Sequence, residues 1–473
     1  MLSNGALRSL ALLLFVLFPS LALAQTPRVE FVWSGALQPT SIRIVAGLSG
    51  TADSVRVALA GGGEFERDVY YSGYRPVDEA SRTVAFEIEA LEPDSVYGYA
   101  VEVDGVLDTL KVGTFRTPPE GPFSFTVIAG GCATTGSDRP IFDVIRRQEP
   151  LFFLHVGDFH YENLDSEDPD VYRQAYRDVL ASRSQAALYR STPIAYMWDD
   201  HDYGPNNSDR FAPGQEAARE AYRTMIPHYP LAAGLGNVPI FQSFTVGRLR
   251  FILTDLRSSR RPHHRLFDRV PTMMGERQKD WFEQELLRAK EDGQVVVWVS
   301  TVPWIYRANP RSDSWGGYAE EREDIANFLK EHEIDDIFIM GGDAHMVAMD
   351  DGSNSDFSTG GDGVPIPVIQ SAPLDQAGSE KGGPYSEGAY PGPTVFPPHN
   401  GQWTLMEVED DGANAVCVRW TGYRTRWDRP SSRPLVEMSR CFDVPTPEEV
   451  SARRNDAGDT ASPKSAQTVE GGQ

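Results

Sequence analysis

The chain has 473 residues, of which 40% are hydrophobic and 11% are aromatic. That is enough for a large packed core and more than one ordinary domain usually contains. Its formal net charge of −24 argues against a general nucleic-acid partner, because such a partner requires basic patches on the protein. The same charge favours solubility and the binding of cations.

Residues 1–24 have the pattern of a cleavable signal peptide. Arg8 precedes an apolar stretch at residues 10–18, and residues 22–24, Ala-Leu-Ala, form a small-x-small cleavage sequence. An uncleaved membrane anchor is the alternative, but the apolar stretch is short for crossing a bilayer. We therefore expect a secreted or periplasmic protein that has no membrane span once the signal is removed.

Residues 25–118 are predicted to form a small all-β domain. Four short segments alternate apolar and polar side chains, with Gly, Pro and Asp between them: SIRIVA, DSVRVALA, TVAFEIEAL and VYGYAVEVDG. This spacing is typical of a sandwich of the immunoglobulin or fibronectin type. The proline-rich stretch FRTPPEGP, residues 115–122, indicates a stiff boundary to the next domain.

Residues 119–445 have a different pattern, which predicts an α/β fold. Apolar runs recur without alternation, and helical stretches such as PDVYRQAYRDVLAS and GERQKDWFEQELLRAKEDG lie between them. Buried strands that alternate with helices indicate a layered α/β domain. Residues 350–400 are rich in Gly, Pro, Ser and Asp, so we expect long loops there. Residues 446–473 are polar, and we expect them to form a disordered tail.

Most of the apolar runs end in side chains that can bind a cation or move a proton. In chain order they are Cys132, then Asp158 and Tyr161, then Asp199, Asp200, His201 and Asp202, then Asp255 and Arg257, and finally Asp343 and His345. The run VVVWVST ends only in Ser300 and Thr301. Ligand sites in such sheets form where the carboxyl ends of the strands meet, so we expect these side chains in one pocket.

So many carboxylates could not all stay ionised in a dry pocket without a cation. The sequence therefore predicts a metal centre with two ions that share Asp158 as a bridging ligand. A thiolate, a phenolate and an imidazole favour a Lewis-acidic transition metal, and ferric iron suits phenolate, whereas carboxylates suit Ca²⁺, Mg²⁺ or Mn²⁺. Gly157 is interpreted as the residue that lets the backbone approach the metal.

The motifs GDFHY, DDHD and GDAH, in this order, resemble those of the calcineurin-like metallophosphoesterases. They are more similar to the alkaline phosphatase D family, with purple acid phosphatases as distant relatives. Cys132 in GGCATTG, where the superfamily usually has Asp-x-His, is a mark of that family. The resemblance covers residues 29–445. It implies a metallophosphoesterase domain, a β-sandwich flanked by helices, behind the small all-β sandwich.

The resemblance also implies ligands for two metal ions. Fe³⁺ would be held by Cys132, Asp158, Tyr161 and His345. The second ion, Ca²⁺ in that family, would be held by Asp158, Asp200 and Asp343, with Mn²⁺, Mg²⁺ or Zn²⁺ as further options. Thr301 occupies a position where the wider superfamily has a metal-binding histidine, which argues against a zinc-like ion at the second site.

The implied activity is hydrolysis of phosphate mono- or diesters by attack of a metal-activated hydroxide, with a small phosphate ester as substrate. His201 would assist the leaving group. Arg257 is a candidate to bind the substrate phosphate, and a salt bridge to the acidic surface is its equal alternative. The alternative function is a non-catalytic exported binding module with a degenerate, metal-stabilised phosphoesterase scaffold. The sequence leaves the natural substrate and the oligomeric state open.

Three cysteines in an exported protein leave one cysteine unpaired. Cys417 and Cys441 both lie in the last segment and are the expected disulfide pair. Cys132 then remains as a free thiol in a glycine-rich turn, where it is either buried and inert or chemically active.

Overall fold

The computed structural model describes residues 28–63, 65, 69–263, 270–394, 401–426, 429–431 and 433–460, with side chains up to residue 455. The predicted signal peptide lies outside these residues. Within them, the helices lack the combination of length and hydropathy that crossing a membrane requires.

The described part of residues 29–116 forms two β-layers around a core of its own. Its strands are β1 (Val29–Gly35), β2 (Ile42–Leu48), β3 (Val55–Gly61), β4 (Val69–Tyr71), β5 (Thr83–Ile88), β6 (Val96–Val103), β7 (Val106–Leu107) and β8 (Gly113–Arg116). β1, β2 and β5 lie in one sheet, and the others form a second sheet. Ile44, Val57 and Val101 are fully or almost fully buried between them.

β1 and β2 belong to two cores at once. Val29 and Val32 face the small core, whereas Phe31 and Trp33 belong to the large core of the molecule. The Trp33 indole N–H donates to the Met225 carbonyl over 3.0 Å. β1 also pairs in parallel with a strand of the following segment. The sheet therefore continues past the expected boundary at residue 118, and the division into domains stays a prediction.

The rest of the chain adds strands to that sheet and forms a second large sheet. The first large sheet also contains β9 (Phe125–Gly130), β10 (Phe152–His155), β11 (Ile194–Tyr196), β19 (Gln402–Glu409), β20 (Ala415–Arg426), β21 (Arg429–Pro430) and β22 (Val436–Asp443). The second contains β12 (Gln242–Val246), β13 (Leu249–Leu253), β14 (Val295–Ser300), β15 (Ile337–Gly341), β16 (Met346–Asp350), β17 (Val368–Ser371) and β18 (Gly388–Pro391).

The two large sheets pack face to face. Phe152 of β10 contacts Phe251 of β13 with ring centroids 5.3 Å apart, and Phe338 of β15 contacts Trp420 of β20 at 4.8 Å. Such aromatic pairs fill the space between the sheets with large apolar surfaces. The parallel strands of both sheets, β9 to β11 and β13 to β15, supply most of this core.

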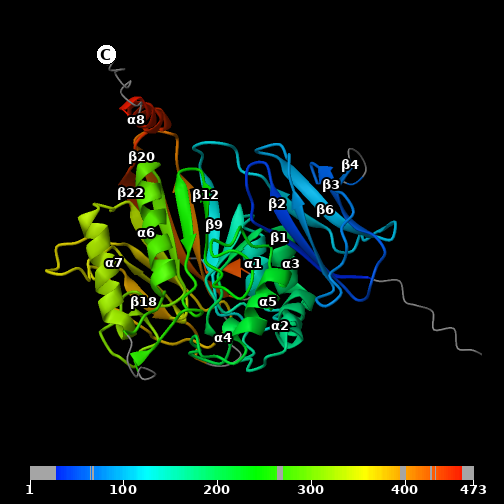
Figure 1. Ribbon diagram of the computed structural model, residues 1–473, viewed down its shortest axis with the longest axis horizontal. Helices are drawn as coiled ribbons and strands as arrows, with labels where there is room; N and C mark the ends of the chain where they lie inside the picture. The colour runs from blue at the N-terminus through cyan, green and yellow to red at the C-terminus, as the bar shows by residue number, and fades with distance from the viewer. Residues whose placement is uncertain are drawn as a thin grey trace, which may run out of the picture.

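Helices cover the outer faces of both sheets (Figure 1). The helices on these sides are α1 (Pro140–Arg146), α2 (Pro169–Ala181), α3 (Ser184–Ser191), α5 (Gln215–Met225), α6 (Glu276–Glu291) and α7 (Ala319–Glu331), the last preceded by the 3-10 helix η2 (Trp315–Tyr318). α4 (Asp200–Tyr203) and α8 (Pro447–Thr460) lie at opposite ends of the molecule (Figure 1). In β14, Val297 faces the first sheet, whereas Trp298 packs on Phe282 of α6. Both faces of this strand are buried, which explains its unbroken apolar sequence. The predicted α/β class is confirmed.

One expectation for the C-terminal part needs correction, and residues 461–473 of the predicted tail lie outside the described residues. Residues 447–460 form α8, not a disordered tail. Thr446 and Glu449 form a capping box, in which the Thr446 N–H donates to Glu449 Oε2 over 2.8 Å and the Glu449 N–H donates to Thr446 Oγ1 over 3.2 Å. Residues 350–400 are mostly loops in their described part, but they also contain β17 and β18.

The predicted disulfide joins Cys417 and Cys441, which lie directly opposite each other on β20 and β22. Cys132 is free and buried. A cavity of about 820 Å³ lies between β8 and the amino ends of β9 to β11, at the opposite end of these strands from the residues predicted to bind metal.

Gly342 allows the carboxyl ends of β10 and β15 to approach each other. A Cβ atom at this residue would overlap the Val156 carbonyl oxygen, a backbone atom that cannot rotate away. We expect Gly342→Ala to lower the free energy of unfolding by roughly 1–3 kcal/mol. Gly73→Ala is the control, because its Cβ would meet nothing within 4 Å. Urea unfolding checks both variants, and equal stability for the two would contradict this account of the strand ends.

Candidate metal centre

The predicted site residues lie in loops at one end of the two large sheets. β9, β10 and β11 run parallel in the first sheet, and β13, β14 and β15 run parallel in the second. Their carboxyl ends meet where the sheets face each other, so loops that are distant in sequence become neighbours. This is the edge at which α/β sheets usually bind ligands.

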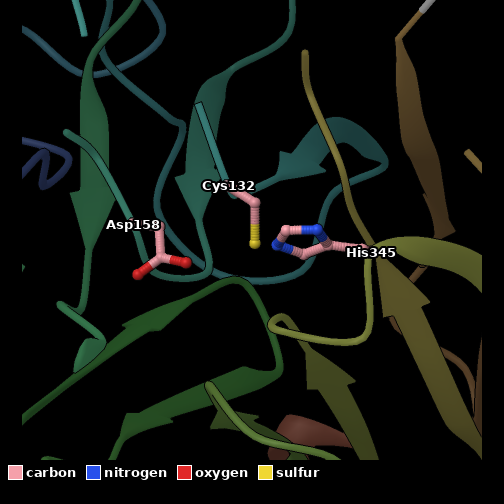
Figure 2. A group of neighbouring side chains, drawn as sticks. All are labelled: Cys132, Asp158 and His345. Atoms are coloured by element: carbon pink, nitrogen blue, oxygen red, sulfur yellow. The ribbon is translucent and has the colours of Figure 1, made fainter. Parts of the chain in front are cut away.

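Cys132, Asp158 and His345 form the first group. The sulfur, one carboxylate oxygen and one ring nitrogen all lie within 4.8 Å of one another. Figure 2 shows the three side chains pointing toward a common centre, each from a different loop. These three donor atoms have the proximity that a single metal ion needs.

The backbone of this group is in the left-handed region. Cys132 has φ 56°, Asp158 φ 56°, Asp343 φ 58° and His345 φ 52°. Non-glycine residues rarely adopt this conformation, and it costs of order 1–3 kcal/mol per residue unless the surroundings require it. Such strain concentrates at functional sites. Four strained residues around one point indicate a site whose geometry is imposed by the tertiary structure.

Gly157 lies where two strand-end loops pack closely. Its φ is 108°, and a Cβ atom there would lie 2.7 Å from the Asp199 Cβ. The glycine therefore allows the Asp158 loop to pack against the Asp199 side chain. The approach of its backbone to a metal stays a prediction.

Tyr161 lies beside the first group. Its hydroxyl is 3.2 Å from His345 Nε2, and its ring stacks on the His201 ring with centroids 3.5 Å apart. His345 Nδ1 lies 2.6 Å from the Ala377 carbonyl oxygen. A carbonyl oxygen only accepts hydrogen bonds, so Nδ1 carries the proton and Nε2 is the nitrogen left for a ligand bond.

Asp158, Asp200 and His201 form a second group with the same 4.8 Å spacing. Asp200 is the first residue of α4. Its Oδ1 accepts the His201 N–H over 2.9 Å, and its Oδ2 accepts the Asn207 N–H over 2.6 Å. Asp158 takes part in both groups, which is the position expected of a bridging ligand.

Asp343 was expected in the second ligand set together with Asp158 and Asp200. In the structure, its carboxylate forms an ion pair with Lys381. A carboxylate has two oxygens, so this pair and a metal bond are chemically compatible. His201, which was expected outside the metals, has a ring nitrogen within 4.8 Å of the other donor atoms of the second group.

Arg257 is fully buried behind the second group. Its Nε donates to Asp199 Oδ1 over 2.6 Å, and its terminal nitrogens bond to Asp313 and to the Ser208 carbonyl. These partners hold the guanidinium in place, and it acts on Asp200 through its charge. Arg257 therefore forms salt bridges, but with Asp199 and Asp313 inside the protein and not with the acidic surface, as the alternative had it.

Thr301 and Asp202 also support the site. The Thr301 hydroxyl donates to Asp199 Oδ1 over 2.9 Å. Asp202 accepts the His160 N–H over 3.0 Å and the Asp199 N–H over 3.1 Å, and so joins the loop after β10 to the loop after β11. Burial raises the pKa of Asp202 to about 7. The bond to Asp199 gives the short polar side chain of Thr301 a structural role.

The donor atoms repel one another when they are ionised. Burial, followed by Asp200 and Asp199, raises the pKa of Asp158 well above its ordinary value. Burial and Asp158 raise the pKa values of the Cys132 thiol and the Tyr161 phenol in the same way. Burial opposes ionisation of Asp200 too, but Arg257 and His201 hold its pKa below the ordinary value. A cation among these donors would relieve the repulsion, so the donor set fits a metal.

Sequence reasoning missed Lys381, Asp313 and Ala377. Ala377 acts through its backbone carbonyl, and Lys381 lies in a loop-rich segment without periodicity, so the sequence contains no pattern that identifies either residue.

Asp255, at the end of a strand, accepts hydrogen bonds from Trp198 Nε1 over 2.9 Å and from the Ile240 N–H over 3.0 Å. Its role is to hold loops together.

The Arg257 network gives a stability prediction. Replacement with methionine would leave Asp199 buried without its main partner, which costs about 3–5 kcal/mol in the free energy of unfolding. The control is Arg116→Met, because the Arg116–Asp94 pair is more than half exposed and such pairs contribute little. Urea unfolding followed by tryptophan fluorescence measures both. A stable Arg257→Met variant would show that the buried pair does not support the fold.

The profile of the PhoD-like phosphatase family matches residues 127–427, which is more than half of the chain. Alkaline phosphatase D of Bacillus subtilis (strain 168) is 23% identical over 312 residues. That alignment covers 56% of this chain and 53% of the relative, so the match spans about half the length of the curated protein.

The solved structure of PhoD has the same fold. It aligns with 91% of this chain and 97% of its own chain, with a TM-score of 0.66 and 16% identity. The family resemblance that the motifs indicated is confirmed, and the chain belongs to the PhoD-like phosphatase family.

Proposed function

We propose that the protein is a metal-dependent phosphoric ester hydrolase that acts on phosphate mono- or diesters. The observation that carries this proposal is the convergence of Cys132, Asp158 and His345 within 4.8 Å, in a chain of the PhoD-like phosphatase family. The match to an alkaline phosphatase supports the same reaction class. The substrate is a small phosphate ester.

Two metal ions share the site in this proposal. The first is Fe³⁺, bound by Cys132, Asp158, Tyr161 and His345. The second is Ca²⁺, bound by Asp158, Asp200 and Asp343, with Mn²⁺, Mg²⁺ or Zn²⁺ as further options. The soft and phenolic donors of the first set suit a Lewis-acidic transition metal, and the carboxylates of the second suit a hard ion.

When bound, such ions neutralise charge on the phosphoryl group and make water acidic enough to act as a nucleophile. The chain's own residues orient the participants. The Ala377 carbonyl fixes the His345 ring, and Asp202 ties the loops that carry Tyr161 and Asp200. His201 stacks on Tyr161, and burial lowers its pKa, which favours the neutral ring near neutral pH. In the proposed role, the N–H of this neutral ring donates a hydrogen bond to the leaving oxygen and assists its departure.

The non-catalytic alternative is not favoured. A degenerate scaffold would be expected to lose donors, yet the thiol, phenol, imidazole and carboxylates remain grouped. Thr301 stands where the wider superfamily has a metal-binding histidine, and its bond to Asp199 gives it a structural reason.

The proposal includes the organisation inferred from sequence. Residues 1–24 are a signal peptide, and the mature protein is secreted or periplasmic. Residues 25–118 form a fibronectin-like or immunoglobulin-like domain, and residues 119–445 form the metallophosphoesterase domain. The shared β1–β2 layer supports rigid attachment of the first domain to the second.

Asp158→Asn tests the metal centre. The amide binds cations poorly, so we expect loss of bound iron and calcium by elemental analysis. Hydrolysis of 4-nitrophenyl phosphate should fall on the order of 100-fold or more, since even residues that only support ligands cost 10–100-fold. Asp165→Asn, at an exposed position in the same loop, is the control. Unchanged turnover or metal content in Asp158→Asn would refute the assignment.

His201→Asn tests the proton donor. We expect kcat to fall roughly 10²- to 10⁴-fold, the usual contribution of a positioned acid, while the metal content stays at the wild-type level. His263→Asn, at an exposed position, is the control. Loss of metal from His201→Asn would instead identify this histidine as a ligand of the second ion.

A further inference from the structure

The loop at residues 372–384 touches two of the three loops that contribute to the first metal group, the turns that carry Cys132 and His345. It follows β17 and was expected to be irregular. Asp375 accepts the Thr134 N–H over 2.6 Å, next to the Cys132 turn. The Ser379 hydroxyl donates to the Ala344 carbonyl over 3.1 Å, inside the turn that carries Asp343 and His345. The loop is therefore fixed to the site at several points.

Lys381 brings a positive charge from this loop to the carboxylates. Its ammonium group pairs with Asp343, and 39% of its side chain is exposed. A lysine ammonium is charged near neutral pH, and that of Lys381 faces a carboxylate of the second proposed ligand set.

Arg257 is the other permanent cation acting on this cluster, and it is not accessible. Its side chain has no exposed surface, and Asp199, Asp313 and the Ser208 carbonyl occupy its nitrogens. A lysine ammonium has three donors, and Asp343 needs only one. Among the described residues beside the cluster, Lys381 is the cation with both solvent access and spare hydrogen-bond donors.

We propose that Lys381 binds a non-bridging phosphoryl oxygen of the substrate and favours monoesters over diesters. The inference rests on the proposed function. Lysine binds phosphate as a point charge. A monoester carries a charge of nearly −2 at neutral pH, because its second pKa is about 6, whereas a diester carries −1. The attraction to Lys381 is therefore greater for the monoester.

The competing interpretation is that Lys381 only holds Asp343 in position. A lysine with that role affects the metal ion and lowers the turnover of both ester classes equally. A lysine that contacts the phosphoryl group affects phosphate binding and the ratio of the two rates, with the metals in place. The two interpretations therefore separate on readouts other than total activity.

Lys381→Gln is the test variant, and Lys381→Arg is the conservative one. Lys330→Gln is the control, because Lys330 also pairs with an aspartate and has 36% of its side chain exposed, but it lies on α7. The measurements are kcat/KM for 4-nitrophenyl phosphate and for bis(4-nitrophenyl) phosphate, calorimetric binding of inorganic phosphate, and elemental analysis.

For Lys381→Gln we expect kcat/KM for the monoester to fall on the order of 10- to 100-fold, the value of a hydrogen bond to a charged group. The fall for the diester should be several-fold smaller, phosphate binding should weaken, and metal content should not change. Lys381→Arg should recover part of the loss, and Lys330→Gln should match the wild type.

Equal losses for both esters, loss of metal, or unchanged phosphate binding would overturn the inference. So would a wild type that prefers the diester. A wild type that hydrolyses neither ester would refute the proposed function. In that case phosphate calorimetry would still test whether Lys381 contacts phosphate, since weaker binding to Lys381→Gln than to the wild type supports such a contact.

Discussion

The constraint behind this structure is the repulsion among anionic donors in a dry pocket. Asp158 and Asp200 are almost fully buried, and Cys132 has no exposed surface. Such groups cannot all ionise together unless positive charge lies among them. Arg257 compensates Asp199 and part of Asp200, which leaves Asp158 and the thiol without a full counter-charge. The chemistry of the site follows from this imbalance, because the remaining need is for cations.

The fold keeps these groups together against their repulsion. Two parallel sets of strands bring loops of both sheets to one edge, and small residues such as Gly157 and Gly342 let the strand ends touch. The left-handed backbone at Cys132, Asp158 and His345 shows that local preference yields to packing there. A ligand set held by strained backbone between two packed sheets is preorganised, so binding an ion requires little reorganisation.

Support for the site comes from distant parts of the chain. The Ala377 carbonyl orients His345, Asp202 joins two strand-end loops, and Thr301 and Arg257 fix Asp199. The shared β1–β2 layer extends this continuity into the amino-terminal segment, where Trp33 packs in the large core. The amino-terminal segment and the site are therefore parts of one packed structure.

The sequence by itself determined the α/β class and the family, and it predicted a set of donor residues, of which Cys132, Asp158 and His345 lie together. Apolar runs that end in charged or polar side chains are a local pattern, and the electrostatic need for a cation follows from residue types alone. The sequence also contained the Thr446–Glu449 capping pattern of α8. The polar composition of the segment nevertheless led to the expectation of a disordered tail.

Only the tertiary structure decided how the donors are partnered. Contacts between residues far apart in sequence decide four features of the site and the fold. These are the burial of Arg257, the pairing of Asp343 with Lys381, the closeness of His201 to Asp158 and the continuation of β1 into the large sheet. Side-chain patterns report which face of a strand or helix is buried, but not which distant group lies opposite. That is fixed when the sheets pack, because the energy of each pair depends on its distance and burial.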